Sequence, residues 1–273
     1  MVATPIGNLK DITLRALEVL KEADLILCED TRTTRKLLSH YGITGKKLLS
    51  LYRDNERKRR PWILEVLSQG ARVALVSEAG TPGISDPGAL VVNEARKAGF
   101  SVISVPGPSA LTALLSISGW DLGKGFLFLG FPPSRKTERR RLLEEVKDYR
   151  YPLVFFVPPH RLRPFLRDAL EILGDRQAVV GRELTKAFEE VLSLTLKAAL
   201  AHFEACEPRG EFVLLVAGRS SSVPQISAEE TLAEVKALRA EGLSLKEAVR
   251  EVATRYGLSC KELYGLAVQK GLT

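Results

Sequence analysis

A short apolar run that ends in a loop rich in glycine and proline constrains this chain more than any other stretch. Residues 73–76 are apolar at every position, which is typical of a strand buried in a parallel sheet. The loop that follows excludes helix and strand, because proline fixes φ and lacks an N–H donor whereas glycine allows positive φ. Its glycines and prolines are Gly80, Pro82, Gly83, Pro87 and Gly88.

The position of this loop predicts a ligand site. The loop lies at the carboxyl end of a strand and precedes a helical pattern over residues 89–98, which is where open α/β folds bind ligands. A tight structural connection is the alternative, and such connections are usually short. This loop is longer and carries several polar side chains, which favours ligand binding: Ser77, Glu78, Thr81, Ser85 and Asp86.

Similar loops follow other predicted strands. Strand and helix alternate along residues 1–118, which predicts an N-terminal α/β domain built on a parallel sheet, and a second α/β domain covers residues 119–222. Residues 1–8 resemble the tail of a strand that enters a loop, and this strand looks cut short, which suggests an earlier start codon or a trimmed N-terminus. The other predicted strands cover residues 25–28, 47–51, 100–105, 126–129, 153–157, 178–186 and 211–218, and polar or Gly/Pro loops follow at 4–8, 29–34, 106–110 and 130–134.

Local signals place the helices. Asp11 is expected to cap a helix over residues 12–22, and Asp30 or Thr31 one over 33–40. Pro61 suits the first position of a helix over 62–69, after the charged run 53–60. Further helices are expected at residues 111–117 and from residue 135 onwards.

Residues 223–273 are expected to form a small helical module. Three S-x-x-E capping boxes begin at Ser227, Ser244 and Ser259, and Gly242 and Gly257 stand where helices commonly end. The last two helices resemble a helix-turn-helix, which leaves two alternatives, nucleic-acid contact and plain packing.

Charge suggests an anionic partner. The 273 residues include 40 Lys and Arg against 33 Asp and Glu, a net charge of +7, and basic residues gather at 53–60 and 135–141. Solvated faces or thermal stability are the alternative explanations. No apolar run reaches the roughly 18 residues of a membrane span. Three distant cysteines fit a reducing cytoplasm better than a disulfide framework or a zinc site.

Several enzyme classes lack their motifs here. The chain contains no G-x-G-x-x-G, Walker A, H-E-x-x-H or G-x-S-x-G pattern, which argues against dinucleotide oxidoreductases, P-loop NTPases, zincins and α/β-hydrolases. What remains are backbone-rich strand-end loops flanked by Asp, Glu, Thr and Arg. Backbone N–H and C=O groups suit a ligand such as S-adenosylmethionine without proving it.

Six motifs in register resemble one family. The chain resembles the type I small-subunit ribosomal RNA methyltransferases of the tetrapyrrole methylase (class III methyltransferase) superfamily, from the first loop to the helical tail. Three departures are Glu78 where Asp is usual, Pro132 in the Gly130 loop, and the basic run 57–60. The motifs cover residues 2–9, 29–34, 77–88, 106–110, 182–190 and 210–212.

The resemblance implies a fold, a reaction and a partner. It implies a homodimer of two-domain subunits, with S-adenosylmethionine in the cleft between the α/β domains, that methylates the 2′-oxygen of a cytidine in the decoding region of 16S ribosomal RNA. The matching loops imply cofactor contacts from Pro5, Gly80, Thr81, Pro82, Ile84, Ser109, Ala110, Phe156, Val157, Gly210, Glu211 and Phe212. Substrate contacts are expected from Asn8, Thr31, Arg32, Arg57, Arg59, Arg60, Arg135 and Arg139.

The attacking hydroxyl benefits from a base, and a sulfonium donor needs no metal. Asp30, Asp86 and Lys186 lie on the matched loops and are the candidates, although Lys186 would need a lowered pKa. Competing functions are methylation of a corrin or porphyrin precursor, a non-enzymatic RNA-binding assembly factor and, less favoured, a nucleotide hydrolase.

Overall fold

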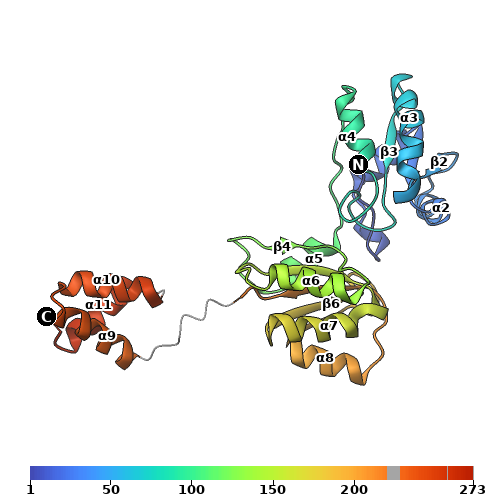
Figure 1. The fold of residues 1–273 in the computed structure, drawn as a ribbon. Helices are drawn as coiled ribbons and strands as arrows, with labels where there is room; N and C mark the ends of the chain where they lie inside the picture. Colours follow the sequence, from blue (N-terminus) through green and yellow to red (C-terminus); the bar gives the residue numbers. More distant parts are fainter. Residues whose placement is uncertain (220–227, 257, 273) are drawn as a thin grey trace. The chain divides into compact units, whose positions relative to one another are not determined.

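The N-terminal part of the chain is built on a three-stranded parallel sheet, as its sequence predicts. The computed structural model describes residues 1–219, 228–256 and 258–272. The strand order is β2-β1-β3, so β1 lies in the middle. Figure 1 labels the two outer strands, β2 and β3. Because all three strands are parallel, their carboxyl ends share one edge, where Glu29, Tyr52 and Ser77 follow. The strands are β1 (Leu25–Cys28), β2 (Lys47–Ser50) and β3 (Val73–Leu75).

Helices connect and follow the strands of this sheet, and two predicted helix caps had different outcomes. Asp30 caps its helix as predicted, since its carboxylate accepts a hydrogen bond from the Arg32 N–H. The Asp11 prediction is wrong: Asp11 lies in a 3-10 turn, and Thr13 caps the following helix. The elements are η1 (Leu9–Asp11), α1 (Leu14–Glu22), α2 (Thr31–His40), α3 (Arg53–Ser68), α4 (Ala89–Lys97) and α5 (Ala110–Ile117).

Two further predictions in this part are wrong. Pro61 lies inside α3 and does not begin it, because Asn55 accepts a hydrogen bond from the Tyr52 N–H and starts the helix within the basic run. Residues 100–105 form no strand. Only Val105 pairs there, in a parallel bridge with Val2, while the Val2 N–H donates to Leu75 O. The N-terminus therefore lies beside β3.

A mixed five-stranded sheet, in the order β4-β5-β8-β6-β7, forms the second α/β part. Only β4 and β5 pair in parallel. The predicted strand over 178–186 ends at Arg182, and β7 was not predicted. The elements are β4 (Leu127–Phe128), α6 (Lys136–Val146), β5 (Leu153–Val157), α7 (Pro159–Leu173), β6 (Gln177–Arg182), β7 (Glu190–Thr195), α8 (Leu196–Ala205) and β8 (Phe212–Val216).

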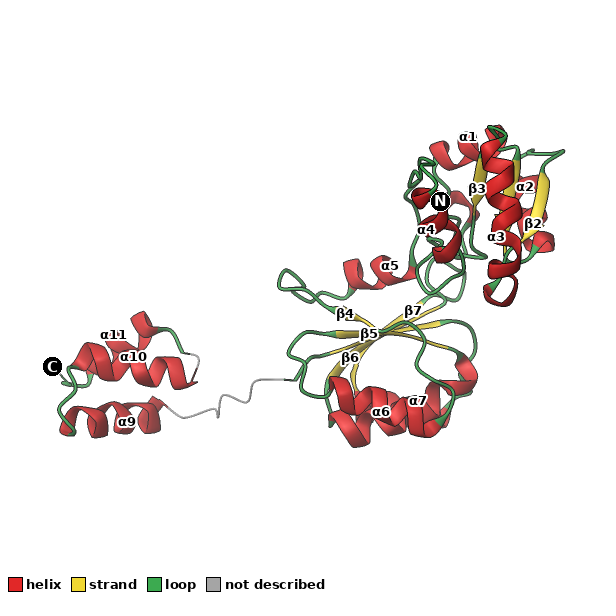
Figure 2. Ribbon diagram, turned by 45° about the horizontal axis from the view of Figure 1, so that its top comes forward, coloured by secondary structure: helices red, strands yellow, loops and turns green. Residues whose placement is uncertain are grey.

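Helices cover both faces of this sheet (Figure 2). Helices α6, α7 and α8 pack on one face, around Phe155, Phe165 and Phe203. On the other face, Leu114 of α5 and Ile6 pack against Val154, Val213 and neighbouring residues. The loop at residues 4–8 and helix α5 therefore fix the N-terminal part against the second sheet.

The C-terminal residues form a separate compact unit. Contacts divide the chain into Met1–Arg219 and Ser220–Thr273. The second unit contains α9 (Ala228–Ala240), α10 (Leu245–Tyr256) and α11 (Cys260–Gln269), which enclose their own core around Val235 and Val252.

The capping boxes of this module are partly tested. The box at Ser244 is confirmed, because the Glu247 N–H donates to Ser244 Oγ and the Ser244 N–H donates to the Glu247 carboxylate. Ser259 accepts a bond from the Glu262 N–H. Ser227, Gly257 and the predicted module start at residue 223 lie outside the described residues, and the division at residue 118 stays a prediction. None of the described helices combines the length and apolarity of a membrane span.

Candidate functional site

A cavity of about 500 Å³ lies where loops from both sheets meet. Nine of the residues predicted to contact the cofactor line it: Gly80, Thr81, Ile84, Ser109, Ala110, Phe156, Val157, Glu211 and Phe212. Pro5, Pro82 and Gly210 are on the same loops but outside the lining. The loops matched through the family resemblance therefore bring nine of the twelve named residues to one cavity, and their contact with a cofactor stays a prediction.

Gly80 joins three loops at the base of the cavity. Its N–H donates to Thr4 O at 2.9 Å, and the Thr4 N–H donates back to Gly80 O at 2.9 Å. Thr81 Oγ1 donates to Pro108 O at 3.1 Å, which adds the loop before α5. The φ angle of Gly80 is +82°, and a Cβ there would lie 3.3 Å from Ile6 Cγ2. Only glycine fits this position without strain.

Aromatic and aliphatic side chains form the opposite wall. Phe156 at the end of β5 contacts Phe128 and Phe131, with ring centroids 4.9 and 5.5 Å apart. Leu184 and Val213 complete this side. Such a wall suits a flat, partly apolar group such as an adenine ring. Sequence reasoning missed Phe131 and Leu184, although the 130–134 loop and the 182–190 motif both pointed to their surroundings.

Three carboxylates lie at the third side, at the carboxyl ends of β1 and β3. Burial raises the pKa of Asp86 to about 6, although the Ser77 hydroxyl opposes this, and the charge of Glu78 adds to the rise. Burial and then the charges of Asp86 and Glu78 raise the pKa of Glu29. Within the described part of the chain, no cation pairs with these three groups. Glu29 was not predicted as a site residue. It lies beside Glu78 only because β1 and β3 are neighbours in the sheet, and the sequence did not show that order.

Charge, size and wall chemistry fit the expected methyl donor. S-adenosylmethionine combines a flat adenine with a sulfonium and an ammonium group, so an apolar wall beside a carboxylate cluster is complementary to it. A volume of about 500 Å³ falls within the usual range of small-ligand sites. No three described His, Cys, Asp or Glu side chains are grouped as a metal site requires.

The three candidate bases differ in how the fold shifts their pKa values. Hydrogen bonds from Arg32 lower the pKa of Asp30 to about 2, which makes it a weak base. Burial opposes the charge of Lys186, but hydrogen bonds to Glu183 and Glu211 outweigh it and raise the Lys186 pKa. The lowered pKa that a base at Lys186 needs is therefore absent. Asp86 lines the cavity and has a pKa near working pH, which suits a general base.

The predicted substrate residues fall into exposed and buried groups. Arg57 is exposed, and Arg59 and Arg60 are half-buried, all in the first turns of α3. Arg135 is also exposed. Thr31 lies at the start of α2, and Asn8 caps η1. Arg32 is exposed and pairs with Asp30 at 2.9 Å.

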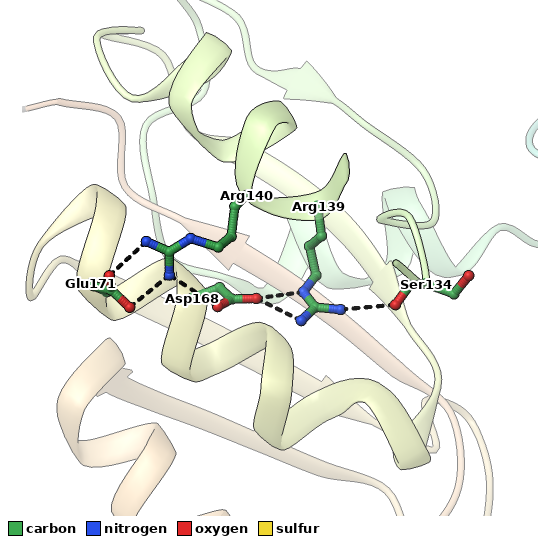
Figure 3. Close-up of polar contacts among 5 residues, drawn as sticks. All are labelled: Ser134, Arg139, Arg140, Asp168 and Glu171. Carbon is green, nitrogen blue, oxygen red and sulfur yellow. Dashed lines mark hydrogen bonds and ion pairs between the residues drawn. The ribbon is translucent and has the colours of Figure 1, made fainter. Parts of the chain in front are cut away.

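Arg139 does not fit its predicted role. Its side chain is only 7% exposed and forms an ion pair with Asp168 at 2.6 Å. A second bond runs to Ser134 O at 3.2 Å (Figure 3). A buried guanidinium with these partners has no free face for a phosphate, so the prediction of an Arg139 substrate contact is corrected.

Comparison with known proteins identifies the family. Residues 1–200 match the family model of the tetrapyrrole (corrin/porphyrin) methylases. A Halalkalibacterium halodurans protein named ribosomal RNA small subunit methyltransferase I is 42% identical over 99% of this chain and 94% of its own length. The protein of that name from Thermotoga maritima is 48% identical over 80% of this chain and 97% of its own length.

Solved structures share the fold at lower identity. The methyltransferase CobJ matches with a TM-score of 0.59 and 22% identity, over 80% of this chain and 93% of CobJ. A diphthine synthase matches with a TM-score of 0.61 and 16% identity, over 80% of this chain and 88% of that protein. These matches support the fold, while activity follows from the closer relatives and the family match. The chain belongs to the tetrapyrrole (corrin/porphyrin) methylase family and is an S-adenosylmethionine-dependent methyltransferase.

Proposed function

We propose that this enzyme methylates the ribose 2′-oxygen of a cytidine in the decoding region of 16S ribosomal RNA. The relatives above carry the name of small-subunit ribosomal RNA methyltransferases. One structural observation supports an RNA substrate for this chain. Helix α3 begins with its basic residues directly after β2, at the sheet edge where Glu29 and Glu78 enter the cavity. A polyanion bound along α3 would lie beside the cavity.

The two basic runs are not equivalent. On α6, Arg135 pairs with Glu138, Arg140 with Glu171 and Arg141 with Glu145, so most of that charge is already matched. Arg57 and Lys58 of α3 are exposed and form no ion pair within the described residues. Free positive charge therefore favours α3 as the phosphate-binding surface.

Salt dependence of RNA binding tests this surface. The double variant Arg57→Gln, Lys58→Gln is expected to weaken binding and to reduce the slope of log K against log salt by about 0.7 per lost phosphate contact on single-stranded RNA. Arg141→Gln removes a paired arginine from α6 and is the matched control, with an unchanged slope. Equal slopes for wild type and the α3 variant would remove α3 from the interface.

Asp86 is the base that we propose for the reaction. S-adenosylmethionine, when bound, supplies an electrophilic methyl group on its sulfonium. Asp86 would take the proton of the attacking 2′-hydroxyl at its carboxylate, while the loops around Gly80 and Phe156 hold the donor and exclude water. Single-turnover rates of Asp30→Asn and Asp86→Asn check the assignment. Asp86→Asn should slow transfer by about 100-fold or more, and Asp30→Asn should stay close to wild type. A wild-type rate for Asp86→Asn would exclude it as the base.

Mass spectrometry tests the proposed function. Small ribosomal subunits, free 16S RNA and a corrin or porphyrin precursor are each incubated with enzyme and methyl-labelled donor. Label on a cytidine ribose of 16S RNA is the expected result. Label on the tetrapyrrole with none on RNA would establish the alternative, which has one argument in its favour, since arginines also bind substrate carboxylates.

Two further features belong to the same proposal. A homodimer is part of the same proposal, and Leu14 and Phe188, each 79% exposed, are the first candidates for its interface. Light scattering of the purified chain would measure the subunit number. Cys28, Cys206 and Cys260 are free thiols, which fits a reducing cytoplasm, where small ribosomal subunits are assembled.

A further inference from the structure

The loop over residues 183–189, next to the cavity, has an unusual backbone. Glu183 has a φ of +49° and Thr185 a φ of +68°, and neither is a glycine. Left-handed backbone at such residues costs about 1–3 kcal/mol each, so it persists only where surrounding contacts hold it. Leu184, between them, lines the cavity.

The side chain of Lys186 provides two of the contacts that hold this loop. Its Nζ donates to Glu183 Oε1 at 2.9 Å and to Glu211 Oε2 at 3.0 Å. Glu183 Oε1 also accepts the Glu211 N–H at 2.8 Å. Glu211 begins the segment that enters β8 and lines the cavity. One ammonium group therefore joins the loop to the wall that carries Phe212.

The stem of Lys186 also packs against the N-terminal loop. A Cβ on Gly7 would lie 2.2 Å from Lys186 Cγ, so glycine is needed for this close approach. One residue further, the Asn8 N–H donates to Thr185 Oγ1 at 3.1 Å. At its other end the same loop pairs with Gly80 through Thr4. Residues 4–8 therefore connect the Gly80 loop to the Lys186 loop, and Ile6 between them lines the cavity.

We propose that Lys186 is a positioning residue, which sets the separation of the two cavity walls through Gly7, Glu183 and Glu211, and is not a base. Its ammonium group neutralises the buried side of Glu183 and orients Glu211 toward the loop. The raised pKa of Lys186, in which hydrogen bonds to both glutamates outweigh burial, agrees with a permanently charged role. The inference rests on methyl transfer by this family and is independent of the RNA substrate.

Donor binding separates a positioning residue from a base. Lys186→Met keeps the stem and removes the ammonium, and calorimetry with S-adenosylmethionine should show binding about tenfold weaker, as expected for lost charge-assisted hydrogen bonds. At saturating donor the transfer rate should fall by less than about threefold, with the acid limb of the pH–rate profile unchanged. Lys186→Arg should restore most of the affinity.

Gly7→Ala provides an independent variant. It leaves Lys186 in place but pushes against its stem, and it should weaken donor binding in the same way. Lys147→Met is the matched control, because Lys147 also pairs with a glutamate, Glu144 at 2.7 Å, on a helix away from the cavity lining. Its donor affinity should equal that of wild type. Circular dichroism melts on all variants distinguish a folded protein with weak binding from general unfolding.

Two results would overturn the proposal. The first is unchanged donor affinity in Lys186→Met together with a rate loss of about 100-fold or more and a shifted pH limb, which is the signature of a base. The second is unchanged affinity in Gly7→Ala. Because donor binding is measured without RNA, failure of the RNA assay with intact donor binding would reject the proposed substrate and leave the role of Lys186 standing.

Discussion

Two groups of carboxylates in the α/β part of this enzyme differ in their partners. On α7, Asp168 is 5% exposed and pairs with Arg139 at 2.6 Å and with Arg140 at 3.3 Å (Figure 3). At the carboxyl ends of β1 and β3, Glu29, Glu78 and Asp86 face one another, and within the described residues no cation pairs with them. The first group is matched by the protein itself. The second is left for something that the protein binds.

The difference separates a carboxylate that stabilises the fold from carboxylates that are available to the proposed ligand. Glu29 and Asp86 are half-buried and Glu78 is exposed, so an unpaired carboxylate costs less folding free energy there than it would at Asp168, and a bound cation can recover that cost. The charges of the α6–α7 pair are satisfied, and they hold the loop of Ser134 against α7. At the strand ends, burial and then the neighbouring negative charges raise the pKa values of Asp86 and Glu29, which suits the proposed proton transfer.

The largest effect is expected at the matched pair. Asp168→Ala leaves the buried Arg139 without its partner and should lower the free energy of unfolding by about 3–5 kcal/mol. Urea unfolding measures this change. The control is Glu171→Ala, which removes the other partner of Arg140 at a side chain that is 64% exposed. Its cost should stay below about 1 kcal/mol. Similar losses for both variants would mean that burial does not distinguish the two carboxylates.

The opposite sign is expected at Asp86. Its pKa lies at about 6 in the folded protein and at 3.8 without the fold, so the folded state loses stability as pH rises between these values. Asp86→Asn removes that loss and should stabilise the ligand-free enzyme by about 1–2 kcal/mol at about pH 8, after allowance for solvent screening. At about pH 3 the gain should vanish. Thermal unfolding at both pH values is the measurement, and a loss of stability at the higher pH would contradict the assigned cost.

Local signals in the sequence predicted the loops but not which side chains lie next to one another in the fold. Clustered glycine and proline residues exclude helix and strand, so the loops at 77–88 and 106–110 were recognisable without the fold. That Glu29 meets Glu78 depends on β1 and β3 being neighbours, which is a property of strand order and not of either segment. Leu184 lies between Glu183 and Thr185, which both have a left-handed backbone. Because residues other than glycine rarely adopt this conformation, the sequence did not predict it.

The charge run of α6 shows the same limit. The sequence predicted a phosphate-binding surface from these arginines. It could not show that Arg139 and Arg140 are paired, because their acidic partners come from α7, in a separate stretch of sequence. Pro61 misplaced the start of α3 for a related reason. A proline marks a helix start on average, but here Asn55 supplies the capping bond further upstream, and the helix continues through the proline.

The smallest effect is expected at Glu78, where the family resemblance leads one to expect aspartate. The charge of Glu78 contributes to the raised pKa of Asp86, after burial. Glu78→Gln should therefore lower the Asp86 pKa and move the acid limb of the pH–rate profile to lower pH by less than about one pH unit. Glu78→Asp keeps the charge and should leave the limb in place. If neither variant moves the acid limb, the charge of Glu78 does not act on Asp86. The strand-end carboxylates would then differ from Asp168 only in how deeply they are buried.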